Sequence, residues 1–253
     1  MHRIPRLAWM LLGGAVALAP ALNGETVGHW RFEEGGGAFA NDSSIHDNDG
    51  TLAGNTAFVS SVPYPSILGL ANNFALTFDG SGDLVSIPDD ASLDVTSAFT
   101  IEAFVRRTAG IDQTLAGVAV KKNVFGNSAG YGIFFGGADS VRAAAQVASP
   151  GSIATANVAI SAGVWHHVAA VYNGTTLTLY VDGQNVASVA GSGNVEVSAQ
   201  PLEIGHFADD FDGEIDEVRV SNVVLTPLEF LRALIFADGF ASGNFNAWSS
   251  HTP

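Results

Sequence analysis

The stretch Val164–Gly183, VWHHVAAVYNGTTLTLYVDG, decides the fold class. It contains two dipeptides, Asn173–Gly174 and Asp182–Gly183, that tolerate the positive φ required in tight hairpin turns. Between them, Thr176–Val181 alternates polar and apolar side chains, as a strand with one buried face does. Before the first turn, Trp165–Tyr172 is apolar on both faces, which indicates a central strand. The stretch therefore predicts two antiparallel strands inside a β-sandwich.

Similar short runs recur along the whole chain. They are separated by Gly, Asn, Asp and Ser, a pattern that favours a sandwich or jelly roll over a parallel sheet. One helix start is present at Thr226–Pro227, where a capping residue precedes a proline at the first helical position. The sequence therefore predicts an all-β fold, a two-sheet antiparallel β-sandwich (jelly roll), with one short C-terminal helix over Leu228–Leu234.

The two ends of the chain differ from this central region. A basic start followed by the apolar run Leu7–Leu18 has the layout of a secretory signal peptide, and a membrane anchor is the alternative. The run is shorter than the roughly 20 residues that span a bilayer. We therefore expect a signal peptide over residues 1–24, a jelly-roll domain over residues 25–235 and a C-terminal tail over residues 236–253. No membrane span remains after signal removal, so the expected location is secreted or cell surface (extracytoplasmic).

Composition narrows the range of functions. The chain has no cysteine, which excludes disulfides, thiolate metal sites and cysteine nucleophiles. The formal net charge is −15, and an acidic surface repels phosphate backbones, so nucleic acid is not an expected partner. The excess carboxylates are compatible with divalent cations, although they also keep an exported protein soluble.

The run Phe99–Arg106 shows the alternation of a strand with two unlike faces. One face is wholly apolar and is expected in the core. The other face carries Glu102, Phe104 and Arg106. That mixture predicts a solvated sheet face, with a ligand-binding role as the alternative.

Six segments follow one another between Val27 and Leu234: WRFEEGGG, NDSSIHDNDGTL, LTFDGSGDLVSIPDDASLD, FTIEAFV, VWHHVAAVYNGTTLTLYVDG and GEIDEVRVSNVVLTPLEF. In this order they resemble the laminin-G-like jelly-roll domains of the concanavalin A-like lectin/glucanase superfamily. The resemblance implies two packed antiparallel sheets, secretion, frequent calcium binding and roles in glycan or protein recognition. Because this fold hosts lectins, adhesion modules and glycosidases, function has to be argued from the site.

The last expected strand, Ile215–Val220, contains one unusual carboxylate. Asp216 shares strand parity with Val218 and Val220, so a buried face would place this carboxylate at the border of the core. A buried and unpaired carboxylate is very costly, so it needs a cation or several hydrogen-bond donors. Pairing with Arg219 or with backbone amides is the alternative to a metal.

Calcium binds six to eight oxygen ligands, many of them from loops. Asp42 lies in the loop NDSSIHDNDG, and Asp79 lies in FDGSGD, where Gly80 can bring a carbonyl close. The family resemblance implies that the Asp of the last strand, here Asp216, meets N-terminal acidic residues, here Glu33, at a structural calcium. The predicted metal ligands are therefore Asp216, Glu33, Asp42, Asp79 and Gly80. Turn capping by the loop aspartates is the alternative.

The segment GEIDE at residues 213–217 resembles the signature of retaining glucanases on this fold. Those enzymes need two carboxyl groups about 5 Å apart, one as nucleophile and one as general acid. Glu214 and Asp216 align on one face of a strand, but Val218 and Arg219 stand where the general acid should be. We therefore expect no enzyme activity, with a glycoside hydrolase as a remote alternative.

The adjacent residues His166 and His167 raise the question of a zinc site. Neighbouring strand residues face opposite sides of a sheet, so packing histidines are the favoured interpretation. The overall hypothesis is a secreted, non-catalytic recognition module that binds carbohydrate and holds a structural calcium ion. A protein-binding adhesion or surface-assembly module is the alternative, so the expected partner is a glycan or an extracellular protein. The residues that bind the ligand and the oligomeric state are not specified by the sequence.

Overall fold

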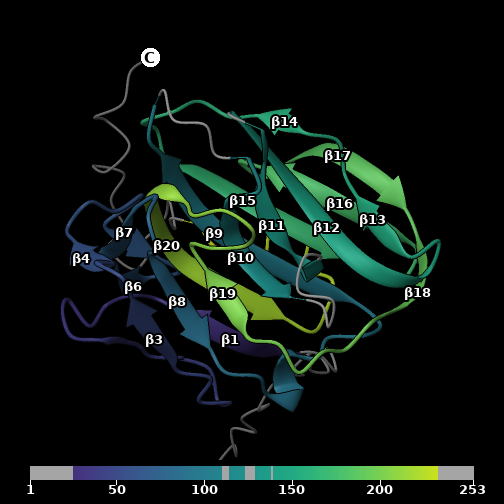
Figure 1. Ribbon diagram of the computed structural model, residues 1–253, viewed down its shortest axis with the longest axis horizontal. Coiled ribbons are helices and arrows are strands. Elements are labelled where there is room, and N and C mark those ends of the chain that lie inside the picture. Colours follow the sequence, from purple (N-terminus) through teal and green to yellow (C-terminus); the bar gives the residue numbers. More distant parts are fainter. Residues whose placement is uncertain (1–24, 110–113, 123–128, 138, 233–253) are drawn as a thin grey trace, which may run out of the picture.

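The computed structural model describes residues 25–109, 114–122, 129–137 and 139–232. Two large antiparallel sheets pack face to face, which confirms the predicted β-sandwich (Figure 1). The predicted signal peptide over residues 1–24 and the predicted tail over residues 236–253 lie outside the described residues.

The first sheet has eight strands: β1 (Thr26–Trp30), β4 (Ala57–Val59), β7 (Ala75–Asp79), β9 (Phe99–Arg107), β15 (His166–Tyr172), β16 (Thr176–Val181), β17 (Gln184–Ala190) and β20 (Asp212–Ser221). Their order is β17-β16-β15-β9-β20-β7-β4, and β1 also pairs with β20. Strand β20 therefore exchanges one neighbour for another along its length, pairing with β7 near its start and with β1 near its end.

The second sheet has ten strands: β2 (Phe39–Ala40), β3 (Gly50–Ala53), β8 (Leu84–Ile87), β10 (Gly117–Lys122), β11 (Ala129–Gly137), β12 (Ser140–Ser149), β13 (Ser152–Ala154), β14 (Val158–Ala159), β18 (Ser192–Val195) and β19 (Leu202–Ile204). Their order is β13-β12-β11-β10-β19-β8-β3-β2, with β14 and β18 also paired to β12. A separate small hairpin consists of β5 (Ser66–Ile67) and β6 (Leu70–Ala71).

The hairpin predicted from Val164–Gly183 is confirmed as β15 and β16, paired from Val168↔Val181 to Tyr172↔Leu177. The side chain of Asn173 accepts hydrogen bonds from the backbone N–H groups of Thr175 and Thr176, which shapes the turn. Strand β15 lies between β16 and β9, so it is a central strand, as its apolar composition indicates. Its core-facing side chains lie beside those of β9 in the same sheet, and both sets belong to the sandwich core.

The outer face of the eight-stranded sheet, the face turned away from the sandwich core, is covered over the middle of β9. Glu102 is 0% exposed and Phe104 is 3% exposed, so the prediction of a solvated face on β9 was wrong. Two covering segments, the β5–β6 hairpin and residues 223–232, supply Ile67 and Leu231, which pack on Phe104. Sequence periodicity could not show this, because the cover comes from segments distant in the chain.

The predicted helix over Leu228–Leu234 was also wrong within the described residues, where residues 227–231 form turns. The backbone groups that a helix would use bind the sheet instead. The carbonyl of Glu229 accepts from the Arg219 guanidinium at 2.7 Å, and the Leu231 N–H donates to Glu102 at 2.8 Å. The one helical element among the described residues is a 3₁₀ turn at Ala91–Leu93. No helix in the described part of the chain is long and apolar enough to cross a bilayer.

Candidate functional site

A β-bulge in β20 creates the most unusual environment in the molecule. Pairing with β9 shifts register between Asp216 and Arg219, and Glu217 adopts a φ of 50°. The extra residue lets Ile215 and Val218 both face the core, while Asp216 and Glu217 are both 0% exposed. Two adjacent carboxylates are thereby buried on the outer face of the sheet.

The two carboxylates are compensated differently. Glu217 binds two basic side chains, His29 at 2.5 Å and Arg31 at 3.1 Å. Asp216 accepts a hydrogen bond from the side-chain amide of Asn72 at 2.8 Å, and a backbone hydrogen bond from Glu217 also favours its ionised form. Burial raises the pKa of Asp216 to about 8, helped by the negative charges of Glu217 and Glu33 and opposed by the Asn72 hydrogen bond. Asp216 is therefore the less compensated of the pair.

Two oxygen atoms at this point have no hydrogen-bond partner. They are Oδ1 of Asp216 and Oδ1 of Asn72, both buried, and they belong to side chains in contact with each other. Buried polar atoms are nearly always paired, so these two oxygens are the unusual feature of the cluster, and oxygen atoms of this kind are the ligands that hard cations take. The sequence prediction identified Asp216, but it missed Asn72, which lies in a segment without a recognisable motif.

The other predicted metal ligands lie in separate surroundings. The negative charge of Glu33 helps to raise the pKa of Asp216, but the Glu33 oxygens accept hydrogen bonds from Asn73 and from the Phe74 N–H. Asp42 accepts from the backbone of His29 and Ser44 at 2.8 Å each, so it caps its own loop. That contact set matches the alternative of turn capping.

Asp79 and Gly80 lie at the end of β7. The Asp79 carboxylate accepts from the Ser81 N–H at 3.0 Å and from the Asn55 side chain at 2.7 Å. Gly80 has a φ of +79°, and a Cβ there would stand 3.2 Å from Cβ of Asp212. Among the residues that the structure describes, no three His, Cys, Asp or Glu side chains are grouped to hold a metal ion. Calcium binding therefore stays a prediction.

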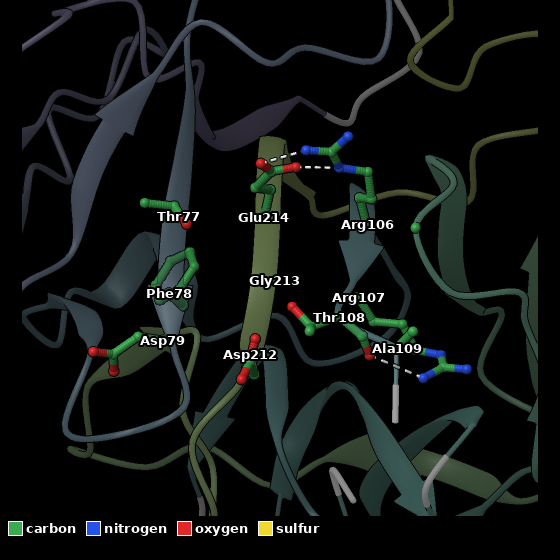
Figure 2. Close-up of a pocket in the computed structure, with 11 residues that line it drawn as sticks. Thr77, Phe78, Asp79, Arg106, Arg107, Thr108, Ala109, Asp212, Gly213 and Glu214 are labelled. Atoms are coloured by element: carbon green, nitrogen blue, oxygen red, sulfur yellow. Dashed lines mark hydrogen bonds and ion pairs between the residues drawn. The ribbon is translucent and has the colours of Figure 1, made fainter. Parts of the chain in front are cut away.

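An open cleft of about 500 Å³ lies where β7, β20 and β9 run side by side (Figure 2). Its charged lining residues are Asp79, Asp212, Glu214, Arg106 and Arg107. The Arg107 guanidinium is buried and bound to Asp139 and to the Ile160 carbonyl, so Arg106 is the arginine that can offer donors to a ligand. Residue types that both donate and accept hydrogen bonds thus share one concave surface held on strands. Such a surface suits a ligand rich in hydroxyl groups.

Arg106 and Glu214 form the central pair of the cleft. They are register partners on β9 and β20, and two guanidinium nitrogens of Arg106 contact the two carboxylate oxygens of Glu214 (Figure 2). The guanidinium also lies over the ring of Trp165, 5.7 Å from its centroid. Gly213, the residue before Glu214 on β20, approaches β9 so closely that a Cβ would stand 2.3 Å from the Arg106 carbonyl oxygen. With its φ of +145°, glycine there lets β20 pair closely with β9.

The residues of the glucanase-like segment do not form an open carboxylate pair. Glu214 is bound to Arg106, Asp216 is buried beneath Asn72, and Val218 lies in the core.

The two histidines have different partners. His167 contacts Glu102 at 2.8 Å, whereas His166 contacts Ser161 and Asp182. They do not share a ligand, in line with the opposite strand faces expected of neighbouring residues. Ser161 and Asp182 were not identified as site residues from the sequence. Asp182 reaches His166 through the register of the hairpin, in which the Asp182 N–H donates a hydrogen bond to the His167 carbonyl.

A two-sheet antiparallel sandwich of this kind is the architecture of jelly-roll domains, lectin domains among them. Residues 79–229, more than half of the chain, match the laminin G family model described as the concanavalin A-like lectin/glucanases superfamily. The chain belongs to this superfamily. Comparison with curated protein sequences finds no match.

Solved structures with the same fold include the binding domains of two other proteins. The binding domain of Paraclostridial Mosquitocidal Protein 1 aligns with a TM-score of 0.61 at 11% identity, over 81% of this chain and 50% of that one. The binding domain of botulinum neurotoxin DC, solved with SialylT, aligns with a TM-score of 0.59 at 13% identity, over 81% and 49%. This chain therefore spans about half the length of these two domains.

Domain 4 of AbnA, a GH43 extracellular arabinanase from Geobacillus stearothermophilus, matches along nearly its whole length. It was solved with arabinotriose and aligns with a TM-score of 0.55 at 16% identity, over 81% of this chain and 96% of that one. At these identities the likeness shows the fold alone.

Proposed function

We propose that this protein is a secreted or cell-surface carbohydrate-recognition module that does not cleave glycosidic bonds. The observation that carries the proposal is the open cleft on β7, β20 and β9, which combines carboxylates with guanidinium groups. Carboxylate oxygens accept hydrogen bonds from sugar hydroxyls and guanidinium groups donate to them. The arabinotriose complex of an AbnA domain with the same fold adds support.

The charges of the cleft favour a neutral glycan. Three of the lining residues are carboxylates, Arg106 is paired with Glu214, and the Arg107 guanidinium is bound to Asp139, so an anionic sugar gains little from the lining. Trp165 is partly exposed beside Arg106 and offers an aromatic surface for a sugar ring at the edge of the cleft.

Affinity electrophoresis of the full chain through a panel of neutral and acidic polysaccharides tests this proposal. We expect retardation on neutral glycans that Arg106→Ala and Glu214→Gln both reduce. Glu196→Gln, an exposed carboxylate outside the cleft, is the matched control and should leave mobility unchanged. Equal mobility of the unaltered protein on every glycan would refute the proposal and favour a protein partner.

We also propose a structural calcium ion at Asp216. The two unpartnered oxygens of Asp216 and Asn72 fit an oxygen-seeking cation, and a positive charge would compensate the buried carboxylate. Glu33 lies close enough to influence the charge of Asp216. When bound, calcium would neutralise this cluster and brace the β5–β6 hairpin against the sheet.

Thermal unfolding with calcium, with magnesium and with EDTA tests the calcium proposal. At a calcium concentration 100 times its Kd, binding stabilises the folded state by about 2.7 kcal/mol. Asp216→Asn should abolish the calcium-dependent rise in Tm, whereas Asp42→Asn, in a loop that caps itself, should keep it. An identical Tm for the unaltered protein in calcium and in EDTA would contradict the site.

A further inference from the structure

Three side chains form a continuous hydrogen-bonded chain at the end of β15. The hydroxyl of Ser161 lies 2.7 Å from Nε2 of His166, and Nδ1 of His166 lies 2.7 Å from Oδ2 of Asp182. The other carboxylate oxygen of Asp182 accepts the His167 N–H at 3.0 Å, which orients it. Each nitrogen of the imidazole therefore meets a different partner, as in a nucleophile, base and orienting acid.

The contacts define where the protons are. An ionised carboxylate can only accept, so Nδ1 of His166 carries the proton that is shared with Asp182. In the neutral imidazole Nε2 is then an acceptor, and the hydroxyl of Ser161 donates to it. Among the described residues, Asp182 is the charged side chain that contacts the His166 ring. We infer that Ser161 is an activated nucleophile, with His166 as its general base and Asp182 as a positioning residue, and that the site hydrolyses carboxylic esters.

The serine is accessible and adjoins the cleft. Ser161 is exposed, and Gly163, two residues further on, lines the cleft. The N–H of Gly163 donates to the carbonyl of Arg107 at 2.9 Å, which fastens this turn to the end of β9. An O-acyl group carried by a carbohydrate in the cleft is therefore the substrate class. This choice of carrier depends on the proposed glycan binding, whereas the nucleophile itself does not.

The reaction balances with water as the only co-reactant. Oγ of Ser161 adds to the acyl carbonyl carbon while its proton passes to Nε2 of His166. The bond to the alcohol oxygen then breaks, and the departing alcohol takes that proton. Water, deprotonated by His166 in turn, attacks the acyl-serine and releases the carboxylic acid and the free serine.

Covalent labelling tests the nucleophile without any glycan. The full chain is incubated with a fluorophosphonate probe, and the modified peptide is located by mass spectrometry. We expect an adduct on Ser161 that is absent in Ser161→Ala and present in Ser152→Ala, an exposed serine on β13. Far-UV circular dichroism of each variant verifies the fold. No adduct on Ser161 in the folded, unaltered protein would overturn the inference.

Hydrolysis of p-nitrophenyl acetate tests the roles of the partners. Ser161→Ala and His166→Gln should each lower the rate above background about tenfold or more. Asp182→Asn keeps a residue type that tolerates its φ of 49°, yet it should slow the reaction and alter the pH profile. Equal rates in Ser161→Ala and the unaltered protein would show that the three side chains only brace the loop. Because these probes need no sugar, this outcome is independent of the glycan tests.

Discussion

Glu102 fastens residues 223–232 to the outer face of the sheet, and replacing it with glutamine probes that attachment. The carboxylate is 0% exposed and accepts from Arg219, from His167 at 2.8 Å and from the Leu231 N–H at 2.8 Å. Glutamine retains the shape but removes the charge, and it points an N–H₂ group at groups that themselves donate. Arg219, 9% exposed, is then left without its counterion.

The magnitude follows from burial of the pair. Breaking a buried ion pair by removing one partner costs about 3–5 kcal/mol. At roughly 2–4 °C per kcal/mol for a domain of this size, Glu102→Gln should lower Tm by about 6–20 °C. Urea unfolding should give a lower midpoint with an unchanged m-value. Amide exchange at Leu231 should accelerate more than exchange within the β15–β16 hairpin, because Leu231 loses its acceptor.

Glu196→Gln is the control, because Glu196 is exposed and its loss should change stability by less than about 0.5 kcal/mol. A loss below about 1 kcal/mol in Glu102→Gln would refute the reasoning. It would mean that the apolar contacts of Phe230 and Leu231 hold the segment without the buried charges.

Three further predictions concern acid, a glycine and a buried lysine. Burial opposes ionisation of Glu102, but the His167 hydrogen bond and the Arg219 charge outweigh it and lower its pKa. The stability that this group contributes is therefore present above its unfolded pKa of about 4.3 and is lost as the pH falls through the lower folded pKa. The urea concentration at the unfolding midpoint should decrease at pH values below about 4, and it should decrease less in Glu102→Gln. Gly205→Ala should lower the free energy of unfolding by about 1–3 kcal/mol in the same assay, because φ is +84° and a Cβ would stand 2.2 Å from the Phe78 ring. Gly183→Ala is the control, because Gly183 has a φ of +76° but no atom near its Cβ position, so its effect measures backbone strain without the steric clash. Lys121→Met should cost about 1–3 kcal/mol, because the buried ammonium contacts Asp89 and the carbonyls of Ser198 and Gln200; an unchanged Tm would contradict that role.

The parts of the fold that could be predicted are those determined by local sequence patterns. Turn dipeptides and alternation identified the β15–β16 hairpin, because side-chain period and turn geometry act over a few residues. The helix after Thr226–Pro227 failed because its backbone groups bind Arg219 and Glu102, which are more than 100 positions apart. Local helix propensity does not take account of such long-range hydrogen bonds, which compete with those of a helix.

The candidate sites divide in the same way. Asp216 stood out because a carboxylate shared parity with apolar neighbours, and it is indeed fully buried. Its bulge is marked in the sequence only by the change of apolar parity between Ile215 and Val218, which in so short a run looks the same as one charged residue on the core face. The hydrogen-bonded chain through Ser161 depends on a turn and a hairpin end that meet only in three dimensions. The segments that contain Ser161 and Asp182 do not carry a recognisable catalytic motif.

The pairing of β1 with β20 has a consequence for biosynthesis. Glu25 and Asn222, which flank this pairing, are hydrogen-bonded although they stand 197 positions apart in the chain. During translation β1 must therefore wait, without its partner, until almost the whole domain has emerged from the ribosome. Such a high contact order slows folding, and the unpaired strand edges are prone to aggregation meanwhile. Chaperone dependence and low yield at high expression rates are the expected signatures of this arrangement.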